Sequence, residues 1–293
     1  MCGEVVENKS AASHLQPGTR VMAIFNQTHL TGQIKEDDLA SGLGWPLPGV
    51  LTQYRCFPPD GLVVVPEYLT DEEASCLPIA SVTAWMSING LRPLGSPIDG
   101  SKEKLTVLVQ GTGGVAVAGL QIAHAMGLRT IITSSSDTKL SRAASELSAD
   151  HTVNYRTHWE WQDPVLDATD HKGADIIFET GGALTLRKSF QCVAFGGLIS
   201  CIGYLSGKNE GDDTKREPEL NRLNVNVLAL RRNVTLKGVL NGPKDRFEEM
   251  LGFYEEKKLR PVVGKTFAFD ETVAALKYLA NGEHFGKVVI KVG

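Results

Sequence analysis

The feature that most constrains the fold is a buried apolar segment that runs into a glycine-rich turn and then into a helical window. Leu105–Gln110 (LTVLVQ) has the composition of a fully buried β-strand. The turn Gly111–Ala116 follows it, and Gly127 stands where a helix C-cap is expected. Between them, apolar side chains recur at helical spacing at Val115, Ala118, Ile122 and Met126. This order predicts the first half of a β-α-β unit.

The same alternation continues along the middle of the chain. Short β-branched apolar runs alternate with amphipathic windows, which is typical of a parallel sheet covered by helices on both faces. Crossovers of this kind are right-handed, so we predict an α/β fold with a doubly wound parallel sheet. The expected strands are Leu105–Gln110, Arg129–Ser134, Asp150–Asn154, Ala174–Thr180, Gly197–Tyr204 and Asn233–Leu240.

The two ends of the chain differ from this middle part. Each end contains short strands, and at the N-terminal end these are separated by Pro/Gly turns. Because each set is too small to form an independent sheet, we expect one smaller β-rich domain assembled from both ends. The expected strands are Gly3–Val6, Val21–Phe25, Gly49–Phe57 and Leu62–Val65 in the first part, and Val262–Phe269 and Lys287–Val292 in the last.

The glycine-rich turn carries the main chemical signal. Gly111 permits a sharp turn, Gly113 lets the backbone approach a pyrophosphate, and Ala116 allows a helix to pack closely on a strand. The following helix N-terminus offers unpaired N–H groups to an anion. The placement between strand and helix favours dinucleotide binding, while a tight turn without a ligand stays as the alternative. A mononucleotide P-loop is disfavoured, since no Gly-Lys-Ser/Thr follows.

The end of the second strand bears on which dinucleotide binds. An NAD site usually carries Asp or Glu there, whereas this chain has three serines at Ser134, Ser135 and Ser136, with Lys139 one helical turn later. Hydroxyls and an ammonium can receive a 2′-phosphate, which favours NADP(H) over NAD(H). Asp137 is the counter-argument because it could reach a ribose, although capping of the next helix explains it equally well.

Composition and charge exclude several classes of protein. The formal charge of −4 and the pI of 6.0 argue against nucleic-acid binding. No stretch is apolar enough to cross a bilayer, and the acidic start lacks a signal sequence. Five cysteines form no C-x-x-C pair, so we expect reduced thiols in a cytoplasmic protein.

The residues that could bind metal or act as a nucleophile form no pattern. The seven histidines and five cysteines show no zinc-ligand spacing, and the four clustered cysteines of a structural zinc lobe are missing. No G-x-S-x-G sequence is present, which disfavours an α/β-hydrolase. We therefore expect no metal.

Four blocks of sequence together resemble the medium-chain dehydrogenase/reductase superfamily. They are Leu105–Val115 (LTVLVQGTGGV), Ile131–Leu140 (IITSSSDTKL), Ala149–Arg156 (ADHTVNYR) and His284–Ile290 (HFGKVVI). The nearest branch is the zinc-independent one that includes quinone oxidoreductases and zinc-type alcohol dehydrogenase-like proteins. The resemblance covers nearly the whole chain, because Leu77-Pro78 and Thr83-Ala84-Trp85 extend it upstream.

The resemblance implies a set of coenzyme-binding residues. The turn would hold the pyrophosphate, the serines and the lysine would face the adenosine phosphate, and a tyrosine would lie by the adenine ribose. Other residues would end central strands at the cleft or lie near the nicotinamide. In chain order the set is Thr83, Gly111, Thr112, Gly113, Gly114, Val115, Ser134, Ser135, Lys139, Tyr155, Gly181, Gly203, Tyr204 and Asn241.

The resemblance also implies a domain organisation. Residues 1–75 would be part of a GroES-like substrate domain, residues 76–258 a Rossmann dinucleotide-binding domain, and residues 259–293 a return segment that completes the substrate domain. Compared with the family, the GroES-like domain would be truncated at its N-terminus. The zinc ligands of zinc-containing relatives would fall before Met1, so a catalytic zinc is not expected.

The function that these observations predict is a zinc-independent, NADP(H)-dependent oxidoreductase. Hydride would pass between the nicotinamide and a carbonyl or activated C=C of a small organic substrate. The proton donor stays open between Tyr54, Cys56 and water. The alternative is a repurposed family member, either a non-redox cyclase, isomerase or dehydratase or an accessory binding protein.

Two further expectations concern assembly and specificity. Family members commonly pair through the last central strand, so we expect a homodimer through Asn233–Leu240. Substrate choice would reside in the loops His29–Trp45 and Ser206–Asn221. The second of these is also compatible with a solvated connection that has no role.

Overall fold

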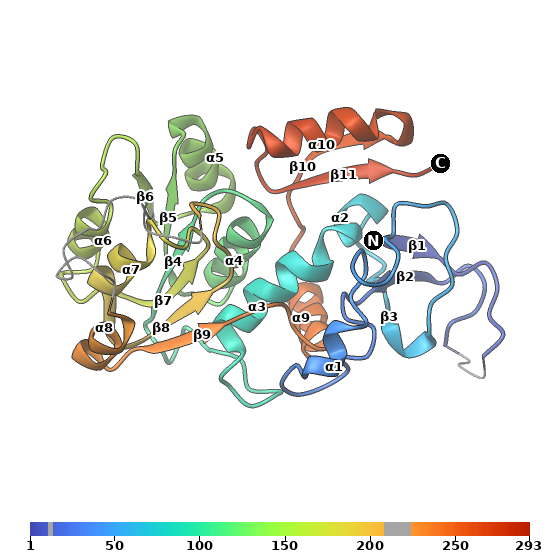
Figure 1. The fold of residues 1–293 in the computed structure, drawn as a ribbon, viewed down its shortest axis with the longest axis horizontal. Helices are drawn as coiled ribbons and strands as arrows, with labels where there is room; N and C mark the ends of the chain where they lie inside the picture. Colours follow the sequence, from blue (N-terminus) through green and yellow to red (C-terminus); the bar gives the residue numbers. More distant parts are fainter. Residues whose placement is uncertain (11–13, 208–223) are drawn as a thin grey trace, which may run out of the picture.

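The core of the molecule is a parallel sheet of six strands (Figure 1). The computed structural model describes residues 1–10, 14–207 and 224–293. The strand order β6-β5-β4-β7-β8-β9 reverses direction between β4 and β7, which is the switch point of a doubly wound sheet. The strands are β4 (Thr106–Gln110), β5 (Arg129–Ser134), β6 (His151–Asn154), β7 (Ala174–Glu179), β8 (Val193–Cys201) and β9 (Thr235–Gly238). The predicted α/β fold and all its central strands are confirmed.

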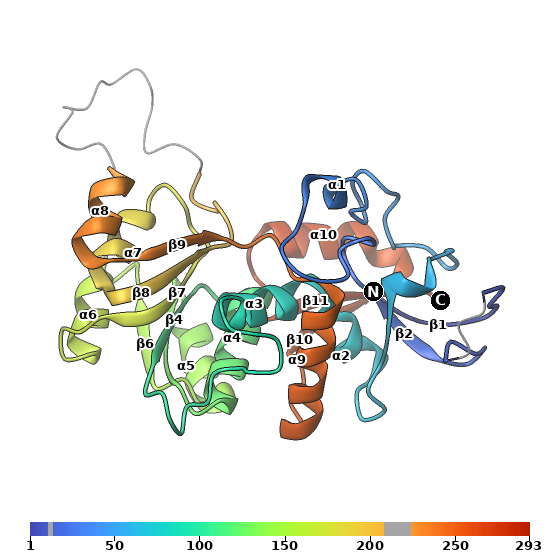
Figure 2. The ribbon, with the colours of Figure 1, turned by 90° about the horizontal axis from the view of Figure 1, so that it is seen from below.

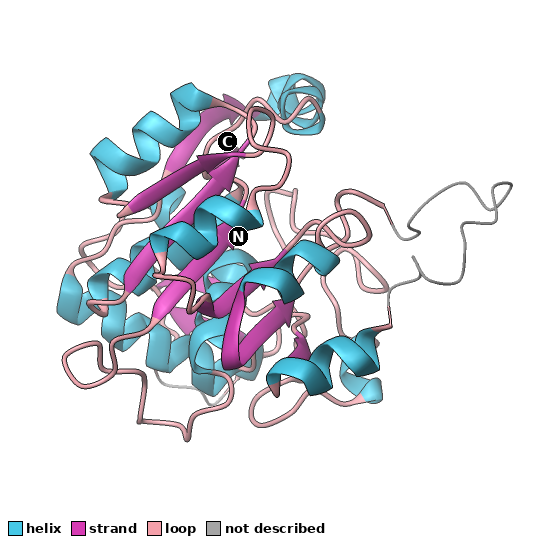
Figure 3. Ribbon diagram, turned by 90° about the vertical axis from the view of Figure 1, so that its left-hand side faces the viewer, coloured by secondary structure: helices cyan, strands magenta, loops and turns pink. Residues whose placement is uncertain are grey.

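Helices cover both faces of this sheet (Figure 3). Alternate sheet residues belong to two separate apolar clusters: Val107 and Val109 face one way, and Leu108 faces the other. The first face is covered by α3 (Val82–Asn89), α4 (Gly114–Ala125), α5 (Asp137–Leu147) and α9 (Lys244–Lys257). The second is covered by α6 (Gln162–Ala168), α7 (Leu186–Cys192) and α8 (Val225–Arg232). Burial on both faces explains the near-continuous apolar runs of the central strands.

Two small sheets lie beside the parallel sheet (Figure 1). One is antiparallel and contains β1 (Cys2–Glu4), β2 (Arg20–Ala23) and β3 (Leu62–Val64). The other is parallel and pairs β10 (Val263–Ala268) with β11 (Lys287–Lys291), joined through α10 (Thr272–Ala280). The short helix α2 (Asp71–Ser75) contacts both sheets. The two ends of the chain thus lie close together but form separate sheets.

Helix α9 connects these parts. It lies between the parallel sheet and the antiparallel strands, as Figure 2 also shows. Trp85 of α3 is fully buried against it, and its Nε1 donates a 2.8 Å hydrogen bond to Glu249 of α9. The shorter elements between the strands are α1 (Glu36–Leu39) and the turns η1 (Pro59–Gly61), η2 (Leu77–Ser81) and η4 (Phe269–Glu271).

One predicted strand is wrong. Gly49–Phe57 forms no strand and runs as an irregular segment between Pro48 and Pro58. Two of its large apolar side chains find no core, since Leu51 and Tyr54 are 46% and 76% exposed, and Phe57 at its end packs only partly buried against a small apolar cluster. Prolines cannot donate to a strand ladder, and without a buried face the β-prone residues have nothing to hold them extended.

Candidate functional site

The glycine-rich turn follows β4 at the switch point of the sheet. Gly111 adopts a φ of +83°, a conformation that costs a residue with a Cβ far more than it costs glycine. Its N–H donates a 2.8 Å hydrogen bond to Thr133 at the end of β5, which holds the turn against the neighbouring strand. Gly113 then serves as the N-cap of α4 in an extended conformation. The first N–H groups of α4 consequently face outward at the carboxyl edge of the sheet.

The space above Gly113 is open. A Cβ built there would have one neighbour within 4 Å, Nε2 of His284 at 3.7 Å. The N-terminus of α4 and the imidazole of His284 therefore border an open space, here called the cradle. A side chain at position 113 would fill it. Such a cradle suits a phosphate group, because N–H groups and a positive dipole end favour an anion.

The C-terminal segment docks directly on this turn. The N–H of Gly286 donates a 3.0 Å hydrogen bond to the carbonyl oxygen of Thr112, and Gly113 pairs with Gly286 as an isolated parallel bridge. A Cβ on Gly114 would stand 2.5 Å from Cδ of Lys287. The missing side chain at Gly114 thus makes room for the lysine stem.

This docking brings His284 and Lys287 to the turn, close to Lys139. The pKa of His284 is lowered by burial and by the neighbouring charges of Lys139 and Lys287. Nζ of Lys139 donates a 2.6 Å hydrogen bond to the carbonyl oxygen of Gly282. Burial lowers the pKa of Lys139, while the negative charge of Glu283 acts in the opposite direction. Sequence reasoning missed His284 and Lys287 as site residues, although both lie in a block that carried the family resemblance.

The serines after β5 have different structural roles. Ser134 is buried, and its Oγ accepts a 3.3 Å hydrogen bond from the N–H of Ser136. Ser136 is the N-cap of α5, with its Oγ accepting from the N–H of Lys139. The capping role considered for Asp137 is wrong, because its Oδ1 accepts from Asn154 at 2.7 Å instead. The N–H of Tyr155 donates to Ser134, which places the tyrosine beside the same strand end.

A buried carboxylate organises the turn after β7. Glu179 is 1% exposed and accepts hydrogen bonds from the N–H groups of Gly181 and Gly182 at 3.0 and 2.9 Å. It also accepts from the Nε2 of Gln110 and from the hydroxyls of Thr185 and Ser189. This network fixes the position of Gly181 at the carboxyl edge of the sheet.

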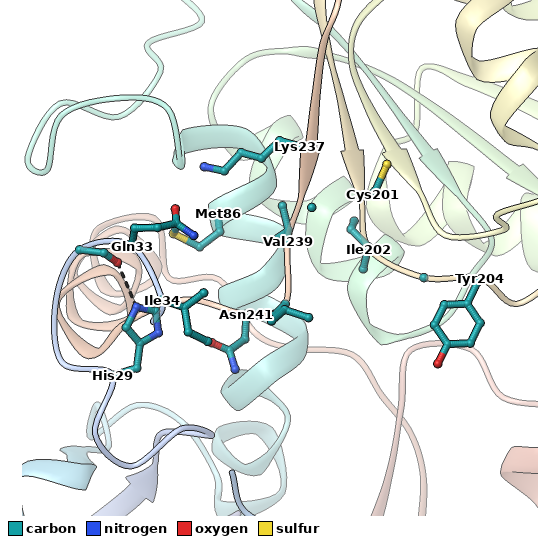
Figure 4. Close-up of a pocket in the computed structure, with 14 residues that line it drawn as sticks. His29, Gln33, Ile34, Met86, Cys201, Ile202, Tyr204, Lys237, Val239 and Asn241 are labelled. Carbon is teal, nitrogen blue, oxygen red and sulfur yellow. Dashed lines mark hydrogen bonds between the residues drawn. The ribbon is translucent and has the colours of Figure 1, made fainter. Parts of the chain in front are cut away.

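A pocket of about 470 Å³ lies where β8 and β9 end (Figure 4). Three of the predicted residues line it: Gly203, Tyr204 and Asn241. Met86 of α3 lines it from one side, and the loop after β2 contributes His29, Gly32, Gln33 and Ile34. The lining includes the first part of the His29–Trp45 loop predicted to govern specificity. Residues 208–221 of the second such loop lie outside the described residues.

Several predicted residues do not line this pocket. Thr83 is buried in α3 with its Oγ1 lacking a hydrogen-bond partner, yet it does not contribute to the lining. Tyr54 and Cys56, the side chains considered as proton donors, are exposed on the irregular segment and do not line it either.

The pocket contains polar residues that sequence reasoning missed. The pKa of Lys237 is lowered by burial and by Arg246, and its Nζ donates a 3.3 Å hydrogen bond to Gly90. Burial raises the pKa of the Cys201 thiol to about 11. His29 is 4% exposed and contacts the carbonyl oxygen of Gly32 through Nε2 at 3.0 Å. His29 is a single residue in a loop, and Cys201 and Lys237 are single residues on β8 and β9, so no spacing in the sequence signals their place in the pocket.

The described residues hold no group of three or more His, Cys, Asp or Glu side chains arranged to bind a metal ion. Within the same part of the chain, no helix is long and apolar enough to traverse a bilayer.

Comparison with known proteins identifies the family. A family model described as zinc-binding dehydrogenase matches residues 114–256. A zinc-type alcohol dehydrogenase-like protein of Schizosaccharomyces pombe is 37% identical over 277 residues, covering 94% of this chain and 76% of the relative. The chain belongs to the medium-chain dehydrogenase/reductase superfamily. It is an oxidoreductase of that superfamily, and the predicted resemblance is confirmed.

Solved structures of medium-chain dehydrogenases agree with the fold. A putative alcohol dehydrogenase from Sinorhizobium meliloti 1021 superposes with a TM-score of 0.84 at 35% identity, over 99% of this chain and 80% of that one. An NAD-dependent alcohol dehydrogenase gives a TM-score of 0.81 at 32% identity, over 100% and 81% of the two chains.

Proposed function

We propose that this chain is a zinc-independent oxidoreductase that uses NADP(H) and acts on a small organic carbonyl, alcohol or activated alkene. The observation that carries the coenzyme assignment is the pair of lysines beside the cradle at the glycine-rich turn. Lys139 and Lys287 lie close to His284, and its imidazole borders the open space above Gly113. A dinucleotide with an additional phosphate matches this charge better than one without it.

The residues at the turn fit the coenzyme. Gly113 leaves the space that a Cβ would fill, and the N-terminus of α4 supplies N–H donors to a pyrophosphate. Ser135 and Lys139 would hold the 2′-phosphate, with Tyr155 beside the adenosine. When bound, the coenzyme would supply or accept the hydride. The chain itself orients the two reactants and supplies the proton.

The substrate would occupy the pocket of about 470 Å³ at the ends of β8 and β9. Met86, Ile202, Val239 and Leu240 make much of its lining apolar, and this suits an aliphatic or aromatic substrate body. Two solved relatives above 30% identity are described as alcohol dehydrogenases, which supports an alcohol or carbonyl as the reacting group.

Titration of the purified protein with NADPH and NADH tests the proposal. We expect NADPH to bind more tightly and its absorbance to fall when hexanal, trans-2-hexenal or menadione is added. Turnover that persists after all nucleotide is removed would instead support the alternative, a non-redox enzyme that uses the same cleft.

We also propose a homodimer that forms through β9. This strand is at the edge of the parallel sheet, so its backbone groups have no neighbouring strand on one side in the described chain. Leu236 on β9 and Leu240 just beyond it are 37% and 64% exposed. A monomeric mass in sedimentation at micromolar concentration would contradict this assembly.

The remaining proposals concern domains and compartment. We keep the division into residues 1–75, 76–258 and 259–293, supported by two small sheets that are separate from the parallel sheet. We place the protein in the cytoplasm, which the unpaired state of all five cysteines supports. Limited proteolysis with mass mapping of the cut sites tests the division, and fractionation of the source cells tests the compartment.

A further inference from the structure

His29 presents an unsatisfied ring nitrogen in the pocket at the ends of β8 and β9. The residue is 4% exposed and lines the pocket. Its Nε2 lies 3.0 Å from the carbonyl oxygen of Gly32, which can only accept a hydrogen bond. Nε2 therefore carries the hydrogen, and in the neutral ring Nδ1 is a bare acceptor. Nδ1 is buried and has no hydrogen-bond partner.

Asn241 presents a second unsatisfied acceptor in the same pocket. Nδ2 of Asn26 donates to the carbonyl oxygen of Asp38 at 2.9 Å, so Oδ1 of Asn26 must be the atom that accepts from Asn241 at 2.8 Å. This chain of bonds fixes the amide of Asn241 with Nδ2 toward Asn26. Its Oδ1 is left buried without a partner. Figure 4 shows His29 and Asn241 on the same side of the pocket.

Two buried acceptors without donors point to a ligand that brings a hydrogen. Burying an acceptor without its partner is unfavourable, and such groups in native proteins are usually satisfied by a ligand or water. The hydroxyl of an alcohol supplies one donor at the point where proton transfer is needed. This group is also the reacting group of the proposed function.

We propose that His29 is the catalytic residue that exchanges the proton with the substrate oxygen. This inference rests on the proposed oxidoreductase function. In alcohol oxidation, the O–H bond breaks and its proton goes to Nδ1, while the C–H bond breaks and its electron pair leaves as hydride to the oxidised nicotinamide. The electron pair left on oxygen forms the π bond of the carbonyl. In the reverse direction, Nδ1–H returns the proton to the carbonyl oxygen.

Asn241 acts as a positioning residue in this scheme. Its Oδ1, fixed by the bond from Nδ2 to Asn26, can accept a hydrogen bond from an N–H or O–H group that is brought into the pocket. Three charged residues adjoin His29: Asp38 in α1 interacts with it electrostatically, Lys237 on β9 lines the same pocket, and the N–H of Lys244 at the start of α9 donates a 3.1 Å hydrogen bond to its carbonyl oxygen.

The other pocket groups suit this role less well. Burial raises the pKa of Cys201 to about 11, so its thiol is a poor proton acceptor at neutral pH. The Nζ of Lys237 is engaged with the carbonyl oxygen of Gly90. His29 alone combines deep burial, a fixed tautomer and a bare nitrogen.

The first test is His29→Gln, with His124→Gln on the exposed side of α4 as the matched control. With 1-hexanol and NADP⁺ as reactants, we expect kcat of His29→Gln to fall by about 10²- to 10⁴-fold, as for loss of a general base. NADPH affinity should not change, because His29 does not lie at the glycine-rich turn. His124→Gln should match wild type in both measurements.

The second test is NMR spectroscopy of the wild-type protein. In protein with ¹⁵N-labelled histidine, assigned by comparison with His29→Gln, the Nδ1 signal of His29 should be that of a bare nitrogen. It should shift when 1-hexanol is added in the presence of NADP⁺. A signal that does not respond to bound alcohol, or a folded His29→Gln enzyme with the wild-type kcat, would overturn the assignment while the oxidoreductase proposal stands. Failure of the wild type to bind either coenzyme would instead remove the proposed function, and this inference with it.

Discussion

The N–H of Gly286 donates a 3.0 Å hydrogen bond to the carbonyl oxygen of Thr112, which fastens the C-terminal segment to the glycine-rich turn. Lys139 strengthens the same junction through its 2.6 Å bond to Gly282. Because His284 and Lys287 belong to this segment, the cradle for a phosphate is built from the turn after β4 and from the C-terminal part of the chain. Neither the turn nor the segment forms it alone.

Gly113→Ala should weaken coenzyme binding without unfolding the protein. The new Cβ would lie 3.7 Å from Nε2 of His284, an ordinary contact, so the melting temperature should change little. It would occupy the space proposed for the pyrophosphate, and we expect the Kd for NADPH to rise by at least about tenfold. Calorimetric titration measures this change. An unchanged Kd in a folded variant would show that no phosphate approaches this glycine.

Gly252→Ala should stabilise the fold. Gly252 lies inside α9, and a Cβ built there meets no atom within 4 Å. Glycine in a helix interior costs about 0.5–1 kcal/mol relative to alanine, so chemical denaturation should show a gain of this size. Gly119→Ala is the contrasting variant, since its Cβ would stand 2.4 Å from Cε2 of Phe178. It should destabilise, and a gain at both positions would contradict the packing described for α4.

Lys139→Gln should reduce the preference for NADPH over NADH. Lys139 follows the serines after β5 in the first turn of α5, and its ammonium is proposed to hold the 2′-phosphate, so a charge-assisted bond would be lost. We expect NADPH affinity to fall about tenfold with little change for NADH. Lys172→Gln, at an exposed loop position, should leave both affinities alone. Equal losses for the two coenzymes would argue that Lys139 only holds Gly282.

His284→Gln should make the fold less sensitive to acid. Burial and the charges of Lys139 and Lys287 lower the pKa of His284 in the folded state, with Glu283 as the nearby opposing charge. As pH falls through the ordinary histidine range, the unfolded chain therefore takes up a proton that the folded chain resists, and stability is lost. When the pH is lowered from about 7.5 to 5.5, the melting temperature should drop more for wild type than for the variant. Parallel curves would contradict the charge environment described for His284.

The parallel sheet could be predicted because each of its strands is indicated by residues that are neighbours in the sequence. Runs such as Leu105–Gln110 are buried on both faces, so composition alone marks them as strands. The turn at Gly111 was equally predictable, since a sharp turn with positive φ requires glycine at that point. The strand Gly49–Phe57 failed because β-propensity needs a face to bury, and the sequence does not show that Leu51 and Tyr54 lack one.

The pocket was harder to predict because its residues come from distant parts of the chain. Gly203, Tyr204 and Asn241 follow strands, and the resemblance pointed to them. His29 lies in an irregular loop, and its chemistry depends on Asn26, Asp38 and Gly32 holding neighbouring groups in fixed orientations. No periodicity or spacing encodes such an arrangement, because it exists only once the loop is folded against α9.

The central claim is that the turn at Gly111–Val115 and the cluster of Lys139, His284 and Lys287 together bind a phosphorylated dinucleotide. Isothermal titration of the full chain with NADPH and with NADH tests it most directly. The account predicts saturable binding of one coenzyme per chain, with NADPH the tighter ligand. Absence of binding heat with either coenzyme, in protein shown to be folded by its melting transition, would contradict it.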